Sequence, residues 1–316
     1  MVTPLSLAAE VLAGDPWRWQ PHPEVWTLLA ALALLYWYAV TRIGPRASRP
    51  GETVVTRAQV AWFVASLAVL EVASDWPVHD LAEEYLYGVH MAQHLLLSFV
   101  VPAMALLATP TWLARLVVGK GRAYRVLRRL ARPVPATLVF NAVVVLTHWP
   151  VVVNASAGNG ALHYGVHVLV VASALLMWLP VCGPLPELRF ALPVQMLYLF
   201  LQSIIPTVPA GWLTFADGVV YRSYDVVPRV FGLSVTHDQQ LAGMLMKVGG
   251  GLFLWSVIAV LFVRFANRDG EDDRTSGATL DRRAPVASGP DGEVLTWEQV
   301  ERELETAGPA PKSPAD

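Results

Sequence analysis

Seven long apolar segments limit the fold of this chain more than any other feature of its sequence. A helix that crosses the hydrocarbon core of a bilayer needs about 20 predominantly apolar residues. Segments of this kind lie at about residues 24–42, 57–75, 85–108, 134–154, 161–181, 190–210 and 238–264. Helices in soluble domains are usually about a dozen residues long. The sequence therefore predicts an all-α integral membrane protein, a bundle of seven transmembrane helices.

The composition agrees with this fold class and excludes several kinds of function. Hydrophobic residues make up 54% of the chain and charged residues 15%, whereas an average soluble domain has about 25% charged residues. The formal net charge of −2 gives no sign of a nucleic-acid partner. Because Cys182 is the only cysteine in the sequence, a disulfide framework and a thiolate metal cage are excluded. A bound metal would need His, Met or carboxylate ligands.

Basic residues in the short connections predict the orientation, because Lys and Arg are retained on the cytoplasmic side of a membrane. Fourteen basic residues fall on one side and three on the other, namely Arg18, Arg222 and Arg229. The connection between the third and fourth segments carries seven basic and no acidic residues. We therefore predict an N-terminus outside and a C-terminus in the cytoplasm, which an odd number of spans requires.

The predicted spans divide the chain into three parts. An extracytoplasmic N-terminal segment occupies residues 1–23, the seven-helix membrane domain residues 24–266, and a cytoplasmic tail residues 267–316. In the tail, acidic residues outnumber basic ones and alternate with Gly, Pro, Ser and Ala. Such a composition cannot bury an apolar core, so we predict that the tail is disordered.

Six of the eight histidines lie in or beside the predicted spans. They are His90, His94, His148, His163, His167 and His237. Four of them form two pairs, HMAQH and HYGVH, with a spacing of four residues. That spacing places both imidazoles of a pair on one helix face, with Cβ atoms about 5–6 Å apart. One metal ion can bridge this distance.

In the predicted topology these six histidines share one depth. At about 1.5 Å per residue they fall within roughly the outer 10–15 Å of the bilayer, and Glu71, Asp75 and Asp238 fall in the same layer. Ionisable residues inside a membrane are rare and usually functional. The pattern therefore predicts a His-rich metal site near the extracytoplasmic face. The alternative for a single histidine such as His237 is an amphipathic side chain at the headgroup interface.

The expected metal is copper, with zinc as the alternative, because imidazole suits both ions. Met91 and Met244 add thioethers, which favour Cu(I). The predicted metal ligands are His90, His94, His148, His163, His167, His237, Asp238 and Met244. The Met ligand is the weakest member of this set, because Met in a span more often serves packing.

Other polar residues also lie on single faces of predicted helices. Asn141 follows Thr137 at a spacing of four in the fourth segment, and Gln202 follows Gln195 at a spacing of seven in the sixth. Lys247 lies about ten residues into the seventh segment. It is too deep to reach water easily, so we expect a carboxylate or carbonyl partner for it.

Four stretches of the sequence resemble the multi-span CtaG family of cytochrome c oxidase assembly factors, the seven-span bacterial type. They are GVHMAQHLLLSFVVPAMALLATP, THWP, HYGVH and HDQQLAGMLMKVGGG, in this order. The resemblance covers about residues 24 to 266, although many members have Pro-Pro where this chain has Val101-Pro102. It implies a multi-pass protein of the bacterial cell membrane that matures a haem-copper oxidase by supplying or handling copper. The residues that match the family motifs are His90, His94, His148, His163, His167, His237, Asp238 and Gln239.

The leading interpretation is thus a non-enzymatic assembly factor, whose partners are oxidase subunits and the lipid bilayer. From the enzyme class, a seven-span zinc hydrolase would use three histidines and a metal-bound water, with a carboxylate as base. A third interpretation is a haem-binding membrane protein. Two histidine pairs on single helix faces fit it less well, because haem takes axial ligands from opposite sides.

Overall fold

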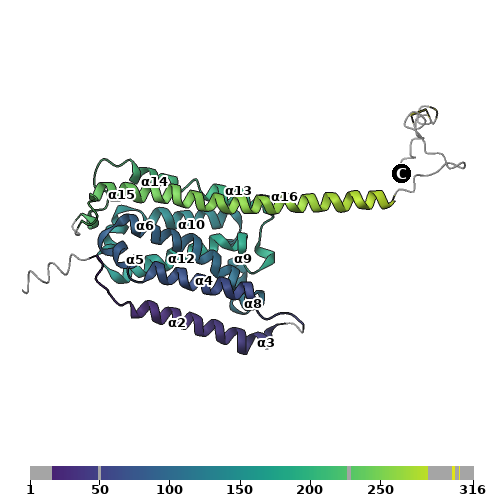
Figure 1. Ribbon diagram of the computed structural model, residues 1–316, viewed down its shortest axis with the longest axis horizontal. Helices are drawn as coiled ribbons and strands as arrows, with labels where there is room; N and C mark the ends of the chain where they lie inside the picture. Colours follow the sequence, from purple (N-terminus) through teal and green to yellow (C-terminus); the bar gives the residue numbers. More distant parts are fainter. Residues whose placement is uncertain (1–15, 49–50, 226–228, 284–300, 303–305, 307–316) are drawn as a thin grey trace, which may run out of the picture. The chain divides into compact units, whose positions relative to one another are not determined.

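The computed structural model describes residues 16–48, 51–225, 229–283, 301–302 and 306, and every regular element in this part of the chain is helical. Contacts divide the chain into two units, Met1–Phe262 and Val263–Asp316. Within the first unit the long helices run side by side as a bundle (Figure 1). In chain order the helices are α2 (Pro23–Tyr38), η1 (Ala39–Ile43), α3 (Gly44–Ala47), α4 (Arg57–Ser74), α5 (Val78–Asp80), η2 (Leu81–Tyr85), α6 (Tyr87–Leu95), η3 (Leu96–Val100), α7 (Val101–Ala108), α8 (Thr111–Val118), α9 (Arg122–Leu130), α10 (Pro133–Thr147), α11 (Pro150–Ala157), α12 (Gly160–Cys182), η4 (Pro186–Leu188), α13 (Leu192–Gln202), α14 (Thr207–Thr214), η5 (Arg222–Tyr224), α15 (Val235–Met244), η6 (Leu245–Gly249) and α16 (Gly250–Arg283).

Six helical stretches of the described chain are long and apolar enough to cross a membrane. They are Pro23–Ala47, Arg57–Ser74, Tyr87–Ala108, Gly160–Cys182, Leu192–Thr214 and Val235–Arg268. The pair α9 and α10 passes the same test together but is bent by 81°, and counting it as one span gives seven. The predicted segments therefore reappear as helices, and the fourth is the one that departs from a straight span.

The predicted fourth segment, residues 134–154, is broken where the sequence reads THWP. Helix α10 ends at Thr147, and α11 begins at Pro150. Proline has no N–H to donate and disfavours a helical conformation of the residue before it. Trp149 is accordingly extended, with φ −70° and ψ 131°. The break leaves His148 between two helices, at the inner end of a buried site.

The core lies where the middle helices of the bundle meet. Phe99, Phe140, Trp178, Leu199 and Leu254 are buried against one another and come from five different helices. The Trp178 Nε1–H donates to the Ser98 carbonyl at 3.1 Å, so the one polar atom of this large side chain is satisfied. Interior packing of this kind fixes how far apart the helices that carry the histidines lie.

The predicted polar faces meet inside the bundle. The Asn141 amide of α10 donates to Gln202 Oε1 of α13 at 2.6 Å, and Gln202 donates in turn to Thr137 Oγ1 at 3.2 Å. Lys247 has the kind of partner that was expected. Its ammonium donates to the Ser203 carbonyl at 3.3 Å and to Thr207 Oγ1 at 2.6 Å. Both residues lie close to Pro206, at the break between α13 and α14.

The first residues of the predicted tail are helical. We predicted disorder from residue 267, but α16 continues as a helix to Arg283. Adding residues to an existing helix avoids the unfavourable nucleation step, and the first proline after the span is Pro285. Most of the remaining predicted tail, including residues 284–300, lies outside the described residues.

Candidate metal centre

Four histidines from two helices face one another near the ends where α6 and α12 begin. The ring centroids of His90 and His94 on α6 lie 4.4 Å apart, as do those of His163 and His167 on α12. Across the two helices, His94 and His167 are separated by 4.9 Å and His90 and His163 by 5.8 Å. We call His90, His94, His163 and His167 the histidine cluster. Its two halves are the two predicted pairs, each on one helix face.

The ligand atoms of the histidine cluster are close enough to share an ion. One nitrogen each of His90, His94 and His167 lies within 4.8 Å of the others. Metal–nitrogen bonds of about 2.0–2.1 Å keep two ligand atoms of one ion within roughly 4 Å of each other. Small rotations of these side chains would therefore bring three imidazoles to one metal.

Three nitrogen atoms of the histidine cluster are buried without a hydrogen bond. They are His94 Nε2, His163 Nε2 and His167 Nε2, which have no hydrogen-bond partner among the described residues. A buried polar atom left without a partner costs about 1–3 kcal/mol, and an ion is one of the few explanations for such an atom in a native structure. This arrangement suits a metal ion, which accepts a lone pair from each of these rings.

Glu83 supplies a carboxylate that sequence reasoning missed. It lies on η2, and its Oε1 is 3.0 Å from His90 Nδ1 and 3.0 Å from His163 Nε2, the second contact without hydrogen-bond alignment. One oxygen of Glu83 and one nitrogen each of His163 and His167 also lie within 4.8 Å of one another. Burial raises the pKa of the Glu83 carboxyl, but the nearby His90 and His163 rings outweigh burial and hold the pKa well below its usual range.

The sequence offered one signal for Glu83, which is its place seven residues before His90 in a short connection at the same end of the bundle. Of the carboxylates predicted in this layer, Asp238 binds the start of α6 and Asp75 has other partners. Asp75 accepts hydrogen bonds from the Trp76 backbone N–H at 2.8 Å and from Trp26 Nε1–H at 2.7 Å.

His148 extends the histidine cluster inward. Its ring centroid lies 6.0 Å from that of His94. His148 Nδ1 donates to the Val144 carbonyl at 2.7 Å, because a carbonyl can only accept. This contact fixes the tautomer and leaves the lone pair on Nε2 for another partner. His148 is therefore oriented as metal-ligating imidazoles usually are.

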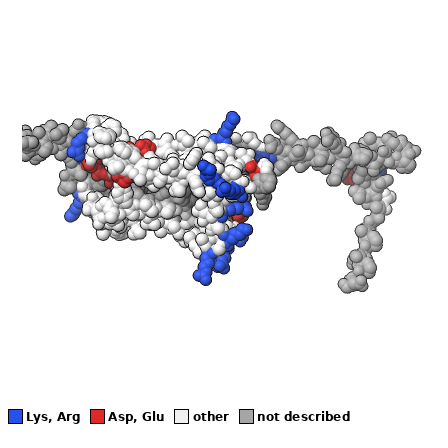
Figure 2. All heavy atoms as spheres, turned by 90° about the horizontal axis from the view of Figure 1, so that it is seen from below, with Lys and Arg blue, Asp and Glu red and all other residues white. Residues whose placement is uncertain are grey.

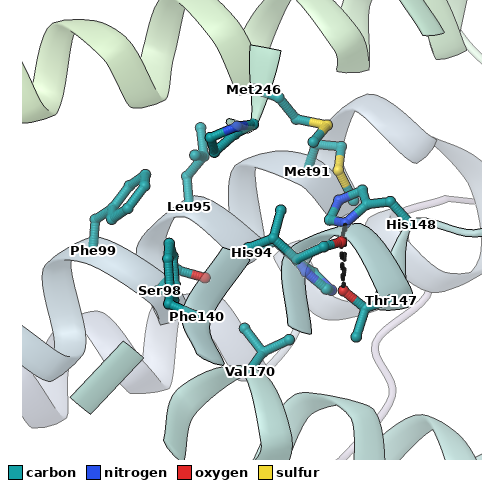
Figure 3. Close-up of a pocket in the computed structure, with 12 residues that line it drawn as sticks. Met91, His94, Leu95, Ser98, Phe99, Phe140, Thr147, His148, Val170 and Met246 are labelled. Atoms are coloured by element: carbon teal, nitrogen blue, oxygen red, sulfur yellow. Dashed lines mark hydrogen bonds between the residues drawn. The ribbon is translucent and has the colours of Figure 1, made fainter. Parts of the chain in front are cut away.

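A cavity of about 50 Å³ lies beside His94 and His148. The thioethers of Met91 and Met246 line it and lie close to each other next to the His148 ring (Figure 3). Met91 is 1% exposed and Met246 9% exposed. A second cavity of about 20 Å³ shares Met91, His94 and His148 with the first and is also lined by Glu83, His90 and His163. We call the part of the site around Glu83 the outer part and the part around Met246 the inner part.

Two predicted ligands are not brought to these residues in the described structure. His237 is exposed near the start of α15, where its backbone N–H donates to Ser234 Oγ at 3.2 Å. Met244 is 45% exposed on the outside of the bundle. The buried face of α15 carries Asp238, Gln239 and Ala242, and His237 and Met244 lie off this face. The methionine of this helix that reaches the cavity is Met246.

Asp238 lies beside the histidine cluster and binds backbone. Its Oδ2 accepts from the Tyr87 N–H at 2.8 Å and its Oδ1 from the Gly88 N–H at 2.9 Å. These amides belong to the first turn of α6 and have no partner within the helix. Asp238 therefore fixes the start of the helix that carries His90 and His94.

Gln239 orders the chain on the other side of the site. Its Oε1 accepts from the backbone N–H groups of Val220 and Tyr221 at 3.0 and 3.3 Å, and its Nε2 donates to the Tyr221 carbonyl at 3.1 Å. The Tyr221 hydroxyl donates to the carbonyl of His148 at 2.9 Å. The DQQ motif thus holds both α6 and the helix break at His148 in place.

Comparison with known families gives one match that spans most of the membrane part. A family model described as cytochrome c oxidase caa3 assembly factor (Caa3_CtaG) matches residues 34–268. The matched residues include Glu83, His148 and the whole histidine cluster. Comparisons with curated proteins and with solved structures found no match.

Proposed function

Because the chain belongs to the family of cytochrome c oxidase caa3 assembly factors, we propose that it assists assembly of a haem-copper oxidase by holding copper in the histidine cluster. The observation that carries this proposal is the pair of buried nitrogens, His94 Nε2 and His167 Nε2, that face each other's helices without a hydrogen-bond partner among the described residues. Copper is the cargo in this role, and no bond of a substrate is made or broken.

The ligand types favour copper over metals that prefer oxygen. Imidazole binds copper and zinc well, whereas thioethers select Cu(I). The outer part of the site pairs His90 and His163 with the Glu83 carboxylate. The inner part places Met91 and Met246 beside His148. A site of this composition suits copper in either oxidation state, with Cu(I) held deeper.

The proposal includes seven spans with the N-terminus outside the cell membrane. The largest group of Lys and Arg lies at one end of the first unit (Figure 2), where α8 and α9 carry basic residues. The stretch from α6 to α7 begins beside Glu83 and ends beside α8. The histidine cluster therefore lies at the end away from the basic connection. If basic residues mark the cytoplasm, the site opens toward the extracytoplasmic side.

The residues around the site would hold the ion and restrict its exchange. Asp238 and Gln239 fix the two backbone segments that carry His90, His94 and His148. Ligands on rigid helices keep their geometry when the ion leaves, so the site stays ready to bind another ion. Of the two cavities, the small outer one is lined by Glu83, which belongs to the connection before α6.

The test is the copper content of purified full-length protein and the oxidase activity of the membranes that contain it. His94→Ala and His167→Ala should each lose the copper held in the histidine cluster and lower oxidase activity, with the protein still inserted. His237→Ala is the matched control, because His237 is an exposed histidine at the same end of the bundle. The proposal fails if both cluster variants keep wild-type copper content and activity. Zinc or a Soret band in wild-type protein would instead support a hydrolase or a haem protein.

A further inference from the structure

A second group of possible metal ligands lies outside the histidine cluster, on segments that sequence reasoning did not connect. We propose that His22, His79 and Asp80, here called the outer triad, bind a divalent transition-metal ion such as Cu(II) or Zn(II). His22 directly precedes α2, and His79 and Asp80 belong to α5. One ligand atom of each residue lies within 4.8 Å of the other two. The family match begins at residue 34 and does not include His22.

The geometry of the outer triad is that of a built site. His22 Nε2 lies 2.7 Å from Asp80 Oδ1, and His79 Nδ1 lies 3.6 Å from the same oxygen. The two imidazole rings are 4.7 Å apart. The side chains are 14%, 18% and 4% exposed for His22, His79 and Asp80. Two imidazoles and a carboxylate at this spacing form a common ligand set for divalent transition metals.

Two atoms of the outer triad are buried and unpaired. His79 Nδ1 and Asp80 Oδ2 have no hydrogen-bond partner among the described residues. An ordinary His22–Asp80 ion pair would leave both atoms without a hydrogen bond, and buried polar atoms are seldom left in that state. A metal ion next to Asp80 would bind the His79 nitrogen and leave the second carboxylate oxygen beside a positive charge.

Glu24 gives the outer triad the support that metal-binding histidines usually have. Its Oε1 lies 3.1 Å from His22 Nδ1, so this carboxylate orients the ring and turns Nε2 toward Asp80. A carboxylate on the far nitrogen of a ligating histidine fixes its tautomer and raises its basicity. Glu24 in turn accepts a hydrogen bond from the Tyr164 hydroxyl at 3.3 Å, which ties it to α12.

The outer triad also joins α2 to the bundle. Among the described residues of α2, Val25 is the one that is buried, so packing alone holds this helix weakly. Its outer end is fixed by polar contacts, including the Gln20 amide donating to Glu84 Oε1 at 2.9 Å. An ion bound by His22 from one segment and by His79 and Asp80 from another would cross-link the two.

The outer triad adjoins the histidine cluster. Glu83, whose Oε1 lies 3.0 Å from His90 Nδ1 and from His163 Nε2, follows the outer triad closely in the chain. Asp80 and Glu83 are three residues apart along α5 and η2. If the proposed function holds, the outer triad is the first binding site that ions reach when they enter from outside. Binding at the outer triad itself does not depend on that function.

The experiment measures metal binding to the full-length protein in detergent after removal of bound metal with a chelator. The double variant His94→Ala/His167→Ala removes two ligands of the histidine cluster and leaves the outer triad intact. We expect it to bind one equivalent of Cu(II), with an electron paramagnetic resonance spectrum that shows nitrogen ligands. Adding Asp80→Asn to this variant should abolish that equivalent. Adding His237→Ala, the control, should not.

Two outcomes would overturn the proposal. One is a double variant that binds no Cu(II) and no Zn(II), which would make the outer triad an ion pair only. The other is binding that survives both Asp80→Asn and His79→Ala. A failure of the proposed function gives a different result, because the single variants His94→Ala and His167→Ala would then lose no metal relative to wild type. Glu24→Gln, which keeps the ligands, should weaken binding by about tenfold.

Discussion

At the scale of single residues, the inner part of the candidate metal centre is distinguished by its two methionines. Met91 comes from α6 and Met246 from η6, and both side chains meet at one cavity beside His148 (Figure 3). Met is often a flexible filler of apolar cores. Here two methionines line the same small cavity as His94, whose Nε2 has no hydrogen-bond partner among the described residues. Their arrangement is what a site for a soft cation requires.

We expect Met91→Leu and Met246→Leu to weaken Cu(I) binding by about tenfold or more, a loss of roughly 1.4 kcal/mol. Zn(II) binding should stay unchanged, because zinc does not depend on thioether ligands. Leu conserves the volume of Met, so the cost in stability is less than about 1.5 kcal/mol. The measurement is competition for Cu(I) with a chromogenic chelator.

The matched control for this prediction is Met244→Leu, because Met244 is 45% exposed and lies two residues from Met246. Its Cu(I) affinity should equal that of the wild type. A loss of affinity in the control, with none in Met246→Leu, would mean that the regular-helix face predicted from the sequence is the one that faces the metal.

The sequence predicted the residues whose positions follow from regular helix geometry. The pairs on α6 and α12 came from a spacing of four residues, which holds wherever the helix is regular. Met246 was missed because the predicted face of this helix carried His237 and Met244, whereas the buried face carries Asp238, Gln239, Ala242 and Met246. Glu83 and His79 were missed because they lie in a connection, whose path depends on tertiary contacts such as the Arg229 guanidinium donating to the Tyr85 carbonyl at 2.8 Å.

At the scale of helices, close contact between α14 and α15 holds the DQQ motif against the site. A Cβ atom at Gly243 would lie 2.5 Å from Thr214 Oγ1 and 2.7 Å from the Ala210 carbonyl oxygen. No pattern in the sequence distinguishes Gly243 from the three consecutive glycines at positions 249–251. Only the packed structure shows which glycine permits the helices to approach.

Gly243→Ala should therefore destabilise the protein by about 1–3 kcal/mol, the usual range for overpacking a well-filled interior. Part of the clash is with backbone, which cannot rotate away. Gly251→Ala is the control, since a Cβ atom there meets no described atom within 4 Å. Thermal unfolding in detergent, followed by circular dichroism, should show a lower midpoint for Gly243→Ala alone. Equal midpoints for the two variants would contradict the close contact.

At the scale of the whole molecule, hydrophobicity predicted where helices run but not where they break. Seven apolar segments are visible because a bilayer demands length and apolar character. The break at His148 depends on Pro150 and on the hydrogen bond from Tyr221, a residue more than seventy positions away. The candidate metal centre thus borders a position where long-range contacts replace the regular helix.

The orientation of the whole molecule is testable with two introduced cysteines. Gly121→Cys lies between α8 and α9, and Gly218→Cys lies between α14 and α15; at both positions a Cβ atom meets no described atom within 4 Å. The background variant Cys182→Ala removes the native thiol. In intact cells a membrane-impermeant maleimide should label Gly218→Cys and leave Gly121→Cys unlabelled until the membrane is opened. The reverse pattern would place the histidine cluster on the cytoplasmic side, where it could not receive copper from outside, and would refute the entry route through the outer triad.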